Sequence, residues 1–276
     1  MHAQAPHGLM RAPAPTGLRP MQHLFTPEGE DALAAVLQRR PLLGFDFDGT
    51  LAPIVAHPDL ARIPEPVARS LQALAALRPV VVVSGRSVAD LHDRLGFVPH
   101  HIVGSHGADD PEAGAAAARH AAALEPLRDH LQRHAGDLAA AGVVVEDKRQ
   151  SIALHYRSAR DPAKARALLR RLLHPAPGGV AIFAGKRVVN ATAGDAPDKA
   201  HAMHELVRRS GADCALFAGD DVNDEPVFAS APPDWLTVRV GRGRRPSQAR
   251  FFVDGPPQVA QMLERVLELL RPHAVV

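Results

Sequence analysis

Two aspartates, Asp46 and Asp48, follow the apolar segment 41–45, and Gly49 and Thr50 then end the run. A short apolar run that glycine terminates is typical of a buried strand leading into a sharp turn. Side chains two positions apart along a strand lie on the same side, so both carboxylates can contact one ligand. Because two negative charges this close repel each other, the pair predicts either a shared proton or a divalent cation.

A capped turn, a calcium loop and a kinase signature each fit this segment less well. A capped turn explains one aspartate and the glycine but not the second carboxylate. A calcium loop needs glycine at its sixth position and a carboxylate at its twelfth, whereas glycine is fourth here and His57 is twelfth. The kinase signature Asp-Phe-Gly is interrupted by Asp48, and no glycine-rich nucleotide loop precedes it. The segment instead resembles the Asp-x-Asp-Gly-Thr signature of the haloacid dehalogenase superfamily, which implies phosphoryl transfer.

This resemblance gives each aspartate a role in phosphoester hydrolysis. A carboxylate that attacks phosphorus forms an acyl-phosphate, which water then cleaves, and Asp46 is the candidate nucleophile. The leaving hydroxyl must gain a proton and the attacking water must lose one, and Asp48 is the candidate general acid and base. Since the phosphate dianion and the nucleophile repel each other, the chemistry calls for Mg2+ with oxygen ligands.

Two later segments supply candidate phosphate-binding groups. The run Val80–Val83 predicts a buried strand and ends in Ser84, Gly85 and Arg86, where a hydroxyl group could bind a phosphate oxygen. A serine before glycine is more often a turn residue, so this assignment depends on the motif order of the superfamily. Lys199 opens a helical stretch that ends in glycine, and the resemblance implies that it holds the nucleophile and the phosphate together.

An acidic block follows the next predicted strand. The run Cys214–Ala218 predicts that strand, and five acidic or amide side chains lie within residues 220–225. Such a block is also found in solvated loops and in the first turns of helices. Directly after a buried strand it resembles the superfamily's metal-binding motif. The resemblance implies that the metal ligands are Asp220, Asp224 in support, Asp46, and the backbone carbonyl of Asp48.

The elements between these motifs predict the architecture. Helical spacing over residues 65–77 and 88–95 separates the strands, with Ser87 as the expected N-cap of the second helix. Alternating strands and helices indicate a Rossmann-like α/β core, in which helices cover a parallel sheet and the chemistry lies at the carboxyl ends of the strands. All the motifs above follow such strand ends.

The segment 106–193 interrupts this alternation. It begins with an alanine-rich helical stretch that Pro126 interrupts, followed by short strand-like runs and a helix that begins after Asp161. A segment of about eighty-five residues is long enough for its own core. We therefore expect an inserted α/β cap over 106–193, a haloacid dehalogenase-like core over 33–105 and 194–276, and a disordered lead-in over 1–32.

Motifs in the cap narrow the resemblance to the trehalose-6-phosphate phosphatase family, from about Leu33 onward. The segments that carry it are Gly104–Gly107, Glu146–Lys148, His155–Arg157 and Asp46–Ile54. The resemblance implies that His106, Lys148 and Arg157 bind sugar hydroxyls, and that Arg86 of the core binds the phosphate end of the substrate. The chain contains sixteen histidines and thirty-two basic residues, so most such side chains are ordinary surface groups.

One departure from the family pattern concerns the sugar. The family usually carries Glu-x-Arg-Pro where this chain has Asn190–Ala193. Because that glutamate belongs to the cap, the departure leaves the identity of the sugar open. The core motifs are not affected.

Composition agrees with a cytoplasmic enzyme. Apolar residues make up 46% of the 276 residues, enough for a two-part core. A net charge of +2 with interspersed signs does not indicate nucleic-acid binding, and the basic stretch 239–250 is expected to be a solvated loop. No apolar run reaches membrane-spanning length, and the single cysteine, Cys214, excludes an internal disulfide.

The sequence thus predicts an Mg2+-dependent phosphatase that hydrolyses trehalose 6-phosphate through an aspartyl-phosphate. A phosphatase for another sugar phosphate, such as sucrose phosphate or a glycosyl-phosphoglycerate, is an alternative, as is a non-catalytic sugar-phosphate sensor. The expected partners are a small sugar phosphate and, in the same pathway, a trehalose-6-phosphate synthase. Neither nucleic acid nor a membrane is an expected partner.

Overall fold

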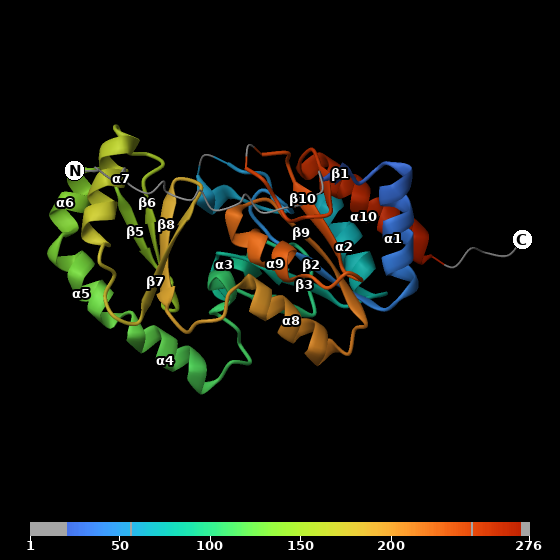
Figure 1. Ribbon diagram of the computed structural model, residues 1–276, viewed down its shortest axis with the longest axis horizontal. Coiled ribbons are helices and arrows are strands. Elements are labelled where there is room, and N and C mark those ends of the chain that lie inside the picture. Colours follow the sequence, from blue (N-terminus) through green and yellow to red (C-terminus); the bar gives the residue numbers. More distant parts are fainter. Residues whose placement is uncertain (1–20, 56, 244, 272–276) are drawn as a thin grey trace, which may run out of the picture.

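The computed structural model describes residues 21–55, 57–243 and 245–271, which form a larger core and a smaller cap (Figure 1). The core contains a seven-stranded sheet in the order β1-β11-β10-β9-β2-β3-β4. Every neighbouring pair in it runs parallel. Its strands are β1 (Gln22–His23), β2 (Pro41–Phe45), β3 (Val80–Val83), β4 (His101–Val103), β9 (Cys214–Gly219), β10 (Leu236–Val240) and β11 (Phe251–Val253).

Helices cover both faces of the core sheet. Figure 1 shows α8 and α9 on one face and α1, α2 and α10 on the other. Both faces of the central strands β2 and β9 are therefore buried, which explains their continuous apolar sequences. The core helices are α1 (Pro27–Gln38), α2 (Glu65–Ala75), α3 (Val88–His92), α8 (Lys199–Ser210), α9 (Glu225–Ser230) and α10 (Pro256–Leu270), with 3-10 turns η1 (Pro58–Leu60), η2 (Ser105–Gly107) and η3 (Val222–Asp224).

The cap is built on an antiparallel sheet in the order β5-β6-β8-β7. Helices α5, α6 and α7 pack on its outer face through a hydrophobic cluster separate from that of the core. The inner face is turned toward the core (Figure 1). The cap elements are α4 (Ala115–Ala123), α5 (Glu125–Arg133), α6 (Ala135–Ala140), β5 (Val144–Asp147), β6 (Ser151–His155), α7 (Pro162–Leu172), β7 (Val180–Gly185) and β8 (Val188–Ala193).

Both connections between core and cap meet helix α8. The second connection, 194–198, leads directly into α8. In the first, Gly107 has a φ of +120°, and a Cβ there would lie 2.4 Å from the carbonyl oxygen of Asp198. Arg209 near the end of α8 also binds the first connection, with Nη1 3.1 Å from Asp110 and 3.0 Å from Glu112. The cap is therefore anchored on the helix that begins with Lys199.

Most local expectations are confirmed. The Ser87 hydroxyl caps α3 by accepting a hydrogen bond from the backbone N–H of Asp90 at 3.2 Å. Gly211 ends α8 in the left-handed region with a φ of 66°. The alanine-rich stretch forms three helices, and Pro126 lies in the first turn of α5, where its missing N–H leaves no bond unmade. The α/β core with an inserted α/β cap is the observed fold class.

Two expectations are wrong in part. The expected lead-in 1–32 is too long, because β1 and the first half of α1 lie within residues 21–32 and Leu24 is fully buried; residues 1–20 lie outside the described residues. The stretch 239–250 is not wholly a solvated loop. Arg239 lies in β10, is 6% exposed, and donates a hydrogen bond to Glu225 at 2.8 Å. The buried ion pair explains how a basic residue occupies a core strand.

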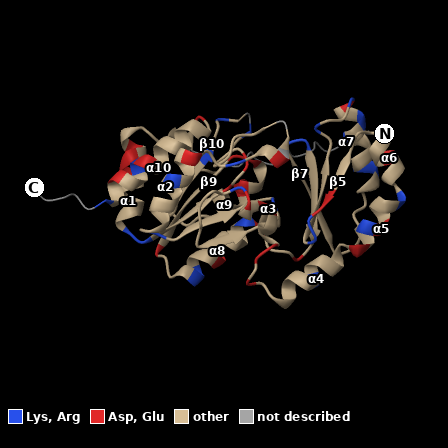
Figure 2. Ribbon diagram, turned by 180° about the vertical axis from the view of Figure 1, so that it is seen from behind, with Lys and Arg blue, Asp and Glu red and all other residues tan. Residues whose placement is uncertain are grey.

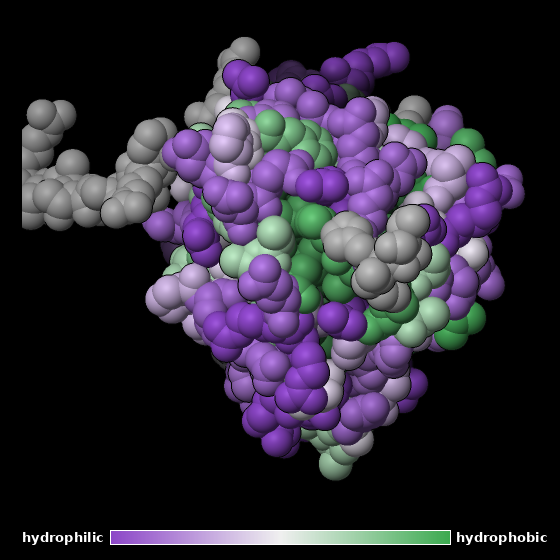
Figure 3. Space-filling model, turned by 90° about the vertical axis from the view of Figure 1, so that its right-hand side faces the viewer, coloured by the Kyte–Doolittle hydropathy of each residue, from purple (hydrophilic) through white to green (hydrophobic). Residues whose placement is uncertain are grey.

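Positive and negative residues are interspersed along the described part of the chain. Charged residues of both signs lie on both the core and the cap (Figure 2). The end of the core that faces away from the cap is mostly hydrophilic around a narrower hydrophobic area (Figure 3). Within the described ranges, no helix has the length and apolar character needed to cross a bilayer.

Candidate active site

Four charged side chains from separate segments meet at the carboxyl end of the core sheet. Asp46 follows β2, Asp220 follows β9, Asp224 ends η3, and Lys199 begins α8. Strands β2 and β9 are parallel neighbours, so their carboxyl ends bring Asp46 and Asp220 together. All four are nearly inaccessible, with exposed fractions of 5% for Asp46, 8% for Asp220, 0% for Asp224 and 2% for Lys199.

Lys199 joins two of these carboxylates. Its Nζ lies 2.9 Å from Oδ1 of Asp46 and 2.7 Å from Oδ1 of Asp224. The backbone N–H of Phe47 also donates to Oδ1 of Asp46, at 2.7 Å. These contacts fix the Asp46 carboxylate by one oxygen. Among the described residues no hydrogen bond reaches its Oδ2, which is the oxygen available to a ligand.

Asp46, Asp220 and Asp224 form an acidic cluster in which one carboxylate oxygen from each lies within 4.8 Å of the others. Carboxylate oxygens are the ligands that Mg2+ prefers, with waters completing its shell. Gly49 keeps space open beside the cluster, because its φ is +81° and a Cβ there would lie 2.2 Å from Oδ2 of Asp220. The donor set and this cradle both fit a divalent cation.

The electrostatics of the cluster also favour a cation. Burial raises the pKa of Asp46 well above its ordinary value, although Lys199 acts in the opposite direction. Burial likewise raises the pKa of Asp220 to about 6. Burial by itself would lower the pKa of Lys199, but the carboxylates of Asp224 and Asp46 outweigh it and raise that pKa. Lys199 is therefore positively charged, but its charge does not balance the negative charges of the three carboxylates.

A second lysine, which was not among the predicted site residues, reaches the cluster from the cap. Lys186 lies in the turn between β7 and β8, and its Nζ forms an ion pair with Oδ2 of Asp220. Its side chain is 49% exposed. In the sequence, the Gly185-Lys186 pair lies between two short apolar runs, which predicts a hairpin turn but does not indicate what that turn contacts.

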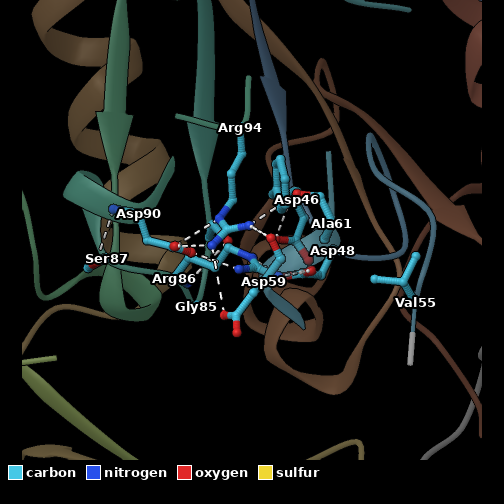
Figure 4. Close-up of polar contacts among 12 residues, drawn as sticks. Asp46, Asp48, Val55, Asp59, Ala61, Gly85, Arg86, Ser87, Asp90 and Arg94 are labelled. Atoms are coloured by element: carbon cyan, nitrogen blue, oxygen red, sulfur yellow. Dashed lines mark hydrogen bonds and ion pairs between the residues drawn. The ribbon is translucent and has the colours of Figure 1, made fainter. Parts of the chain in front are cut away.

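Asp48 is oriented by Arg86 (Figure 4). Arg86 donates to both carboxylate oxygens of Asp48, each at 2.8 Å, and to Asp90 at 2.7 Å. Arg94 binds the other oxygen of Asp90 at 2.8 Å through its Nε. The Arg86 guanidinium also lies over the Phe47 ring, 5.1 Å from its centroid. The predicted phosphate ligand Arg86 therefore positions the predicted acid and base.

Ser84 and Gly85 differ in their access to ligand. The Ser84 side chain is buried, and its Oγ accepts a hydrogen bond from the backbone N–H of Arg86 at 3.2 Å. Its role as a phosphate donor stays a prediction. Gly85 reaches the ligand space, and a Cβ there would lie 2.4 Å from Cε1 of His106. A side chain at Gly85 would therefore displace the His106 ring.

His106 lies between core and cap. Its ring packs edge-on against Phe183 of β7 at a centroid distance of 5.1 Å. Burial, with the nearby charges of Lys199 and Lys148, holds the pKa of His106 well below its ordinary value, although a hydrogen bond with Asn190 acts in the opposite direction. His106 is therefore a neutral contact between the two halves at pH 7.

The two predicted cap cations also contact the core. Lys148 donates to the backbone carbonyl of Gly85 at 2.9 Å, and Arg157 donates to the carbonyl of Val55 at 3.3 Å. Glu146 lies beside Lys148, 3.5 Å from its Nζ. Lys148 and Arg157 therefore lie where the cap contacts the core.

A cavity of about 480 Å³ lies between the two halves. Of the predicted site residues, all but Ser84 and Asp224 line it. Those two are buried just behind its wall. The lining also contains residues to which the sequence motifs gave no role in the site, among them Ile54, Val55, Asp59, Asp90, Val144, Lys186, Val188 and Asn223.

Comparison with known proteins agrees with this geometry. The trehalose-phosphatase family profile matches residues 44–257. The chain belongs to the trehalose-phosphatase family. It is 35% identical over 266 residues to a trehalose-phosphate phosphatase of Mycolicibacterium paratuberculosis, an alignment that covers 88% of this chain and 65% of that protein. It is also 34% identical over 245 residues to an uncharacterized glycosyl hydrolase of Mycobacterium tuberculosis, covering 83% of this chain but 18% of that protein. The chain thus spans less than two thirds of the length of either relative.

The trehalose-phosphatase fold is also seen in solved structures. The C-terminal domain of the trehalose-6-phosphate phosphatase of C. albicans superposes with a TM-score of 0.73 at 22% identity, covering 90% of this chain and 98% of that domain. The sucrose-phosphatase of Synechocystis superposes with a TM-score of 0.54 at 18% identity, covering 84% and 98%. At these identities the likeness concerns the fold.

The structure also locates the departure from the trehalose-phosphatase pattern. Asn190 stands on β8, is 4% exposed and lines the cavity. It replaces the glutamate that the family usually carries and forms a hydrogen bond with His106. A neutral pair therefore lies at this point on the cap wall, where the family pattern predicts a negative charge.

Proposed function

We propose that this chain is an Mg2+-dependent phosphatase that converts trehalose 6-phosphate to trehalose and phosphate through an aspartyl-phosphate. The observation that best supports this proposal is the acidic cluster, which lies at the floor of a cavity covered by the cap. Lys199 lies 2.9 Å from Asp46 in this cluster. The family match and the relatives called trehalose-phosphate phosphatases support the substrate.

In the first half-reaction Asp46 Oδ2 attacks phosphorus, and the bond between phosphorus and the sugar oxygen breaks. The sugar oxygen takes a proton from Asp48, which Arg86 orients. Lys199 holds the other Asp46 oxygen in place. Mg2+ bound by the acidic cluster would offset the negative charge between the carboxylate and the phosphate.

In the second half-reaction water attacks the phosphorus of the aspartyl-phosphate and loses a proton to Asp48. The bond between phosphorus and Asp46 breaks, which restores the carboxylate and releases inorganic phosphate. Asp48 is 44% exposed, so it can exchange protons with solvent between turnovers.

A second candidate is a phosphatase for another sugar phosphate, and Asn190 is the observation that favours it. A panel of trehalose 6-phosphate, sucrose 6-phosphate, a glycosyl-phosphoglycerate and glucose 6-phosphate, assayed for phosphate release, tests both. We expect the largest kcat/KM for trehalose 6-phosphate. A larger value for another member would make that compound the substrate in place of trehalose 6-phosphate. If no member is hydrolysed, the phosphatase proposal is wrong and the non-catalytic sugar-phosphate sensor is the remaining alternative.

Chelation of divalent cations is expected to stop hydrolysis, and Mg2+ to restore it. Asp46, Asp220 and Asp224 cannot approach a phosphate dianion without a compensating cation. The measurement is phosphate release after exhaustive dialysis against a chelator and again after adding Mg2+. Calorimetric titration with Mg2+ should show binding to the wild type and weaker binding to Asp220→Asn. Full activity after chelation would contradict the metal assignment.

Asp48→Asn is expected to lower kcat about 100- to 10,000-fold on a sugar phosphate, because the variant can neither give nor take the proton. The loss in the first half-reaction should be smaller for an activated aryl phosphate, whose leaving group needs no proton. Burst kinetics with both substrates separate the half-reactions. Asp90→Asn is the matched control, since it removes the other Arg86 contact and leaves Asp48 intact. Equal losses in the first half-reaction for both substrates would remove Asp48 as the acid.

Lys148→Ala is expected to weaken binding of the sugar phosphate by about 1–3 kcal/mol, the cost of losing a charge-assisted hydrogen bond. An aryl phosphate that does not reach the cap should show a smaller change in KM. Lys164→Ala provides the control, because Lys164 lies on α7 with its side chain 87% exposed. If both substrates lose affinity equally, Lys148 acts through the Gly85 contact that holds the cap in place.

A further inference from the structure

Apolar side chains line part of the catalytic cavity, among the charged groups. They are Val144 and Val188 of the cap and Ile54 and Val55 of the core. Ile54 is 53% exposed and Val144 is 61% exposed. Such exposure is unusual for large apolar residues inside a cleft, and a ligand that covers them gains free energy from the water released.

The strand register places the two valines in one row. In the β5–β6 pair Val144 lies opposite His155, and in the β6–β8 pair His155 lies opposite Val188. Gly185 of β7 lies opposite Val188, so the row continues without a side chain. A Cβ at Gly185 would lie 2.8 Å from Cγ1 of Val188. We call Val144, His155 and Val188 the apolar row.

The neighbouring row on the same face of the cap sheet carries two polar side chains, Glu146 and Asn190. Ala153 lies opposite both of them, and Phe183 of β7 lies opposite Asn190. The His155 ring is held by Glu146, because its Nε2 lies 2.8 Å from Oε2 of that residue. The cap wall therefore presents hydrogen-bonding groups beside an apolar strip.

The core supplies a second apolar side to the same place. Arg157, two residues beyond His155, donates to the carbonyl of Val55. This contact places the loop that carries Ile54 and Val55 next to the end of β6 where the apolar row lies. Ile54 and Val55 line the same cavity as the row.

We propose that the apolar row, with Ile54 and Val55, binds the C–H face of the second sugar ring of a disaccharide phosphate, the ring that carries no phosphate. This rests on the proposed phosphatase activity. The phosphate must lie at the acidic cluster of the core, so a ligand that also reaches the cap wall extends beyond the phosphate. A sugar ring has hydroxyl groups at its edge and C–H groups on its faces, which matches the polar side chains of Glu146 and Asn190 beside the two valines.

The test replaces the two row valines by threonine, which keeps the branched shape and exchanges a methyl group for a hydroxyl. The measured quantity is the KM for a disaccharide phosphate divided by the KM for glucose 6-phosphate. The double variant Val144→Thr, Val188→Thr is expected to raise this ratio about 5- to 20-fold. Val145→Thr is the matched control. Val145 is the next residue of β5, points to the opposite face and is 40% exposed, so its variant should leave the ratio unchanged.

Binding supplies a readout that does not depend on turnover. In an Asp46→Asn background, calorimetric titration should show the double variant losing affinity for the disaccharide phosphate and not for glucose 6-phosphate. An unchanged ratio, or an equal effect of Val145→Thr, would overturn the inference. So would a wild type that prefers glucose 6-phosphate to both trehalose 6-phosphate and sucrose 6-phosphate.

The two proposals fail in different ways. Suppose that the wild type hydrolyses sucrose 6-phosphate rather than trehalose 6-phosphate, and that the row variants raise the ratio. The trehalose assignment is then wrong, and the apolar subsite stands. Suppose instead that trehalose 6-phosphate is the substrate and the ratio does not move. The function then stands, and the subsite is wrong.

Discussion

Asp46→Asn is expected to abolish turnover, with kcat at least about a thousandfold below wild type. The amide has nearly the same shape, but it cannot form the acyl-phosphate. Its oxygen can still accept the bonds from Lys199 and Phe47 that fix the side chain. Because burial raises the pKa of Asp46 well above its ordinary value, a neutral group suits this position, and we expect a melting temperature at or above that of the wild type.

The control for Asp46→Asn is Asp59→Asn. Asp59 also lines the cavity, but its side chain is 96% exposed, so the same chemical change at the rim should leave kcat within about twofold. Phosphate release and thermal unfolding are measured on both variants. More than trace activity in Asp46→Asn, after contaminating phosphatases are excluded, would refute the covalent mechanism.

Lys199→Met is expected to lower the free energy of unfolding by about 3–5 kcal/mol, because it leaves the buried carboxylates of Asp46 and Asp224 without their shared cation. Methionine fills nearly the same space, so the loss comes from charge rather than from a cavity. We expect kcat to fall sharply as well, since Asp46 is no longer held. Urea denaturation in the absence of divalent cations measures the stability.

The pH dependence of this loss has a definite sign. Protonated carboxyls need no cation, so the stability gap between wild type and Lys199→Met should narrow as the pH falls from 8 to 5. Added Mg2+ should stabilise the variant more than the wild type, because the acidic cluster lacks its internal cation.

Lys186→Met is the control for Lys199→Met. Its side chain is 49% exposed and, among the described residues, is paired with Asp220 alone, so its loss should cost at most about 1 kcal/mol. If Lys199→Met also lost no more than about 1 kcal/mol of unfolding free energy, this would contradict the inference that Lys199 compensates the charge of the buried carboxylates.

The core motifs were predictable because each is local. A buried strand ending in a polar residue is visible in the residue types themselves, and the carboxyl ends of parallel strands lie at one edge of a sheet. Asp46 and Asp220 therefore meet as soon as β2 and β9 pair. Asp224 reaches the same place because η3 follows β9 closely, and Lys199 does so because it is the first residue of α8, the helix that leads into β9.

The cap contacts were not predictable in the same way. Lys186 contacts Asp220 although 34 residues separate them, and nothing in the Gly185-Lys186 pair indicates how far the β7–β8 turn reaches. Arg86 was predicted to bind phosphate, and the structure shows that it also binds Asp48 and Asp90. The exposed charge pattern of a segment does not indicate which distant segment it will meet.

The sequence by itself determined the strand-terminal aspartates, the parallel α/β core and the insertion of a second α/β unit, because hydrophobic period and turn residues act over a few neighbouring positions. Only the tertiary structure decided which groups share the cavity. The packing of the cap against the core places Lys186 at Asp220, Asn190 at His106, and the apolar row in the same cavity as Ile54. Those contacts depend on the relative position of two separately packed cores, which no local pattern specifies.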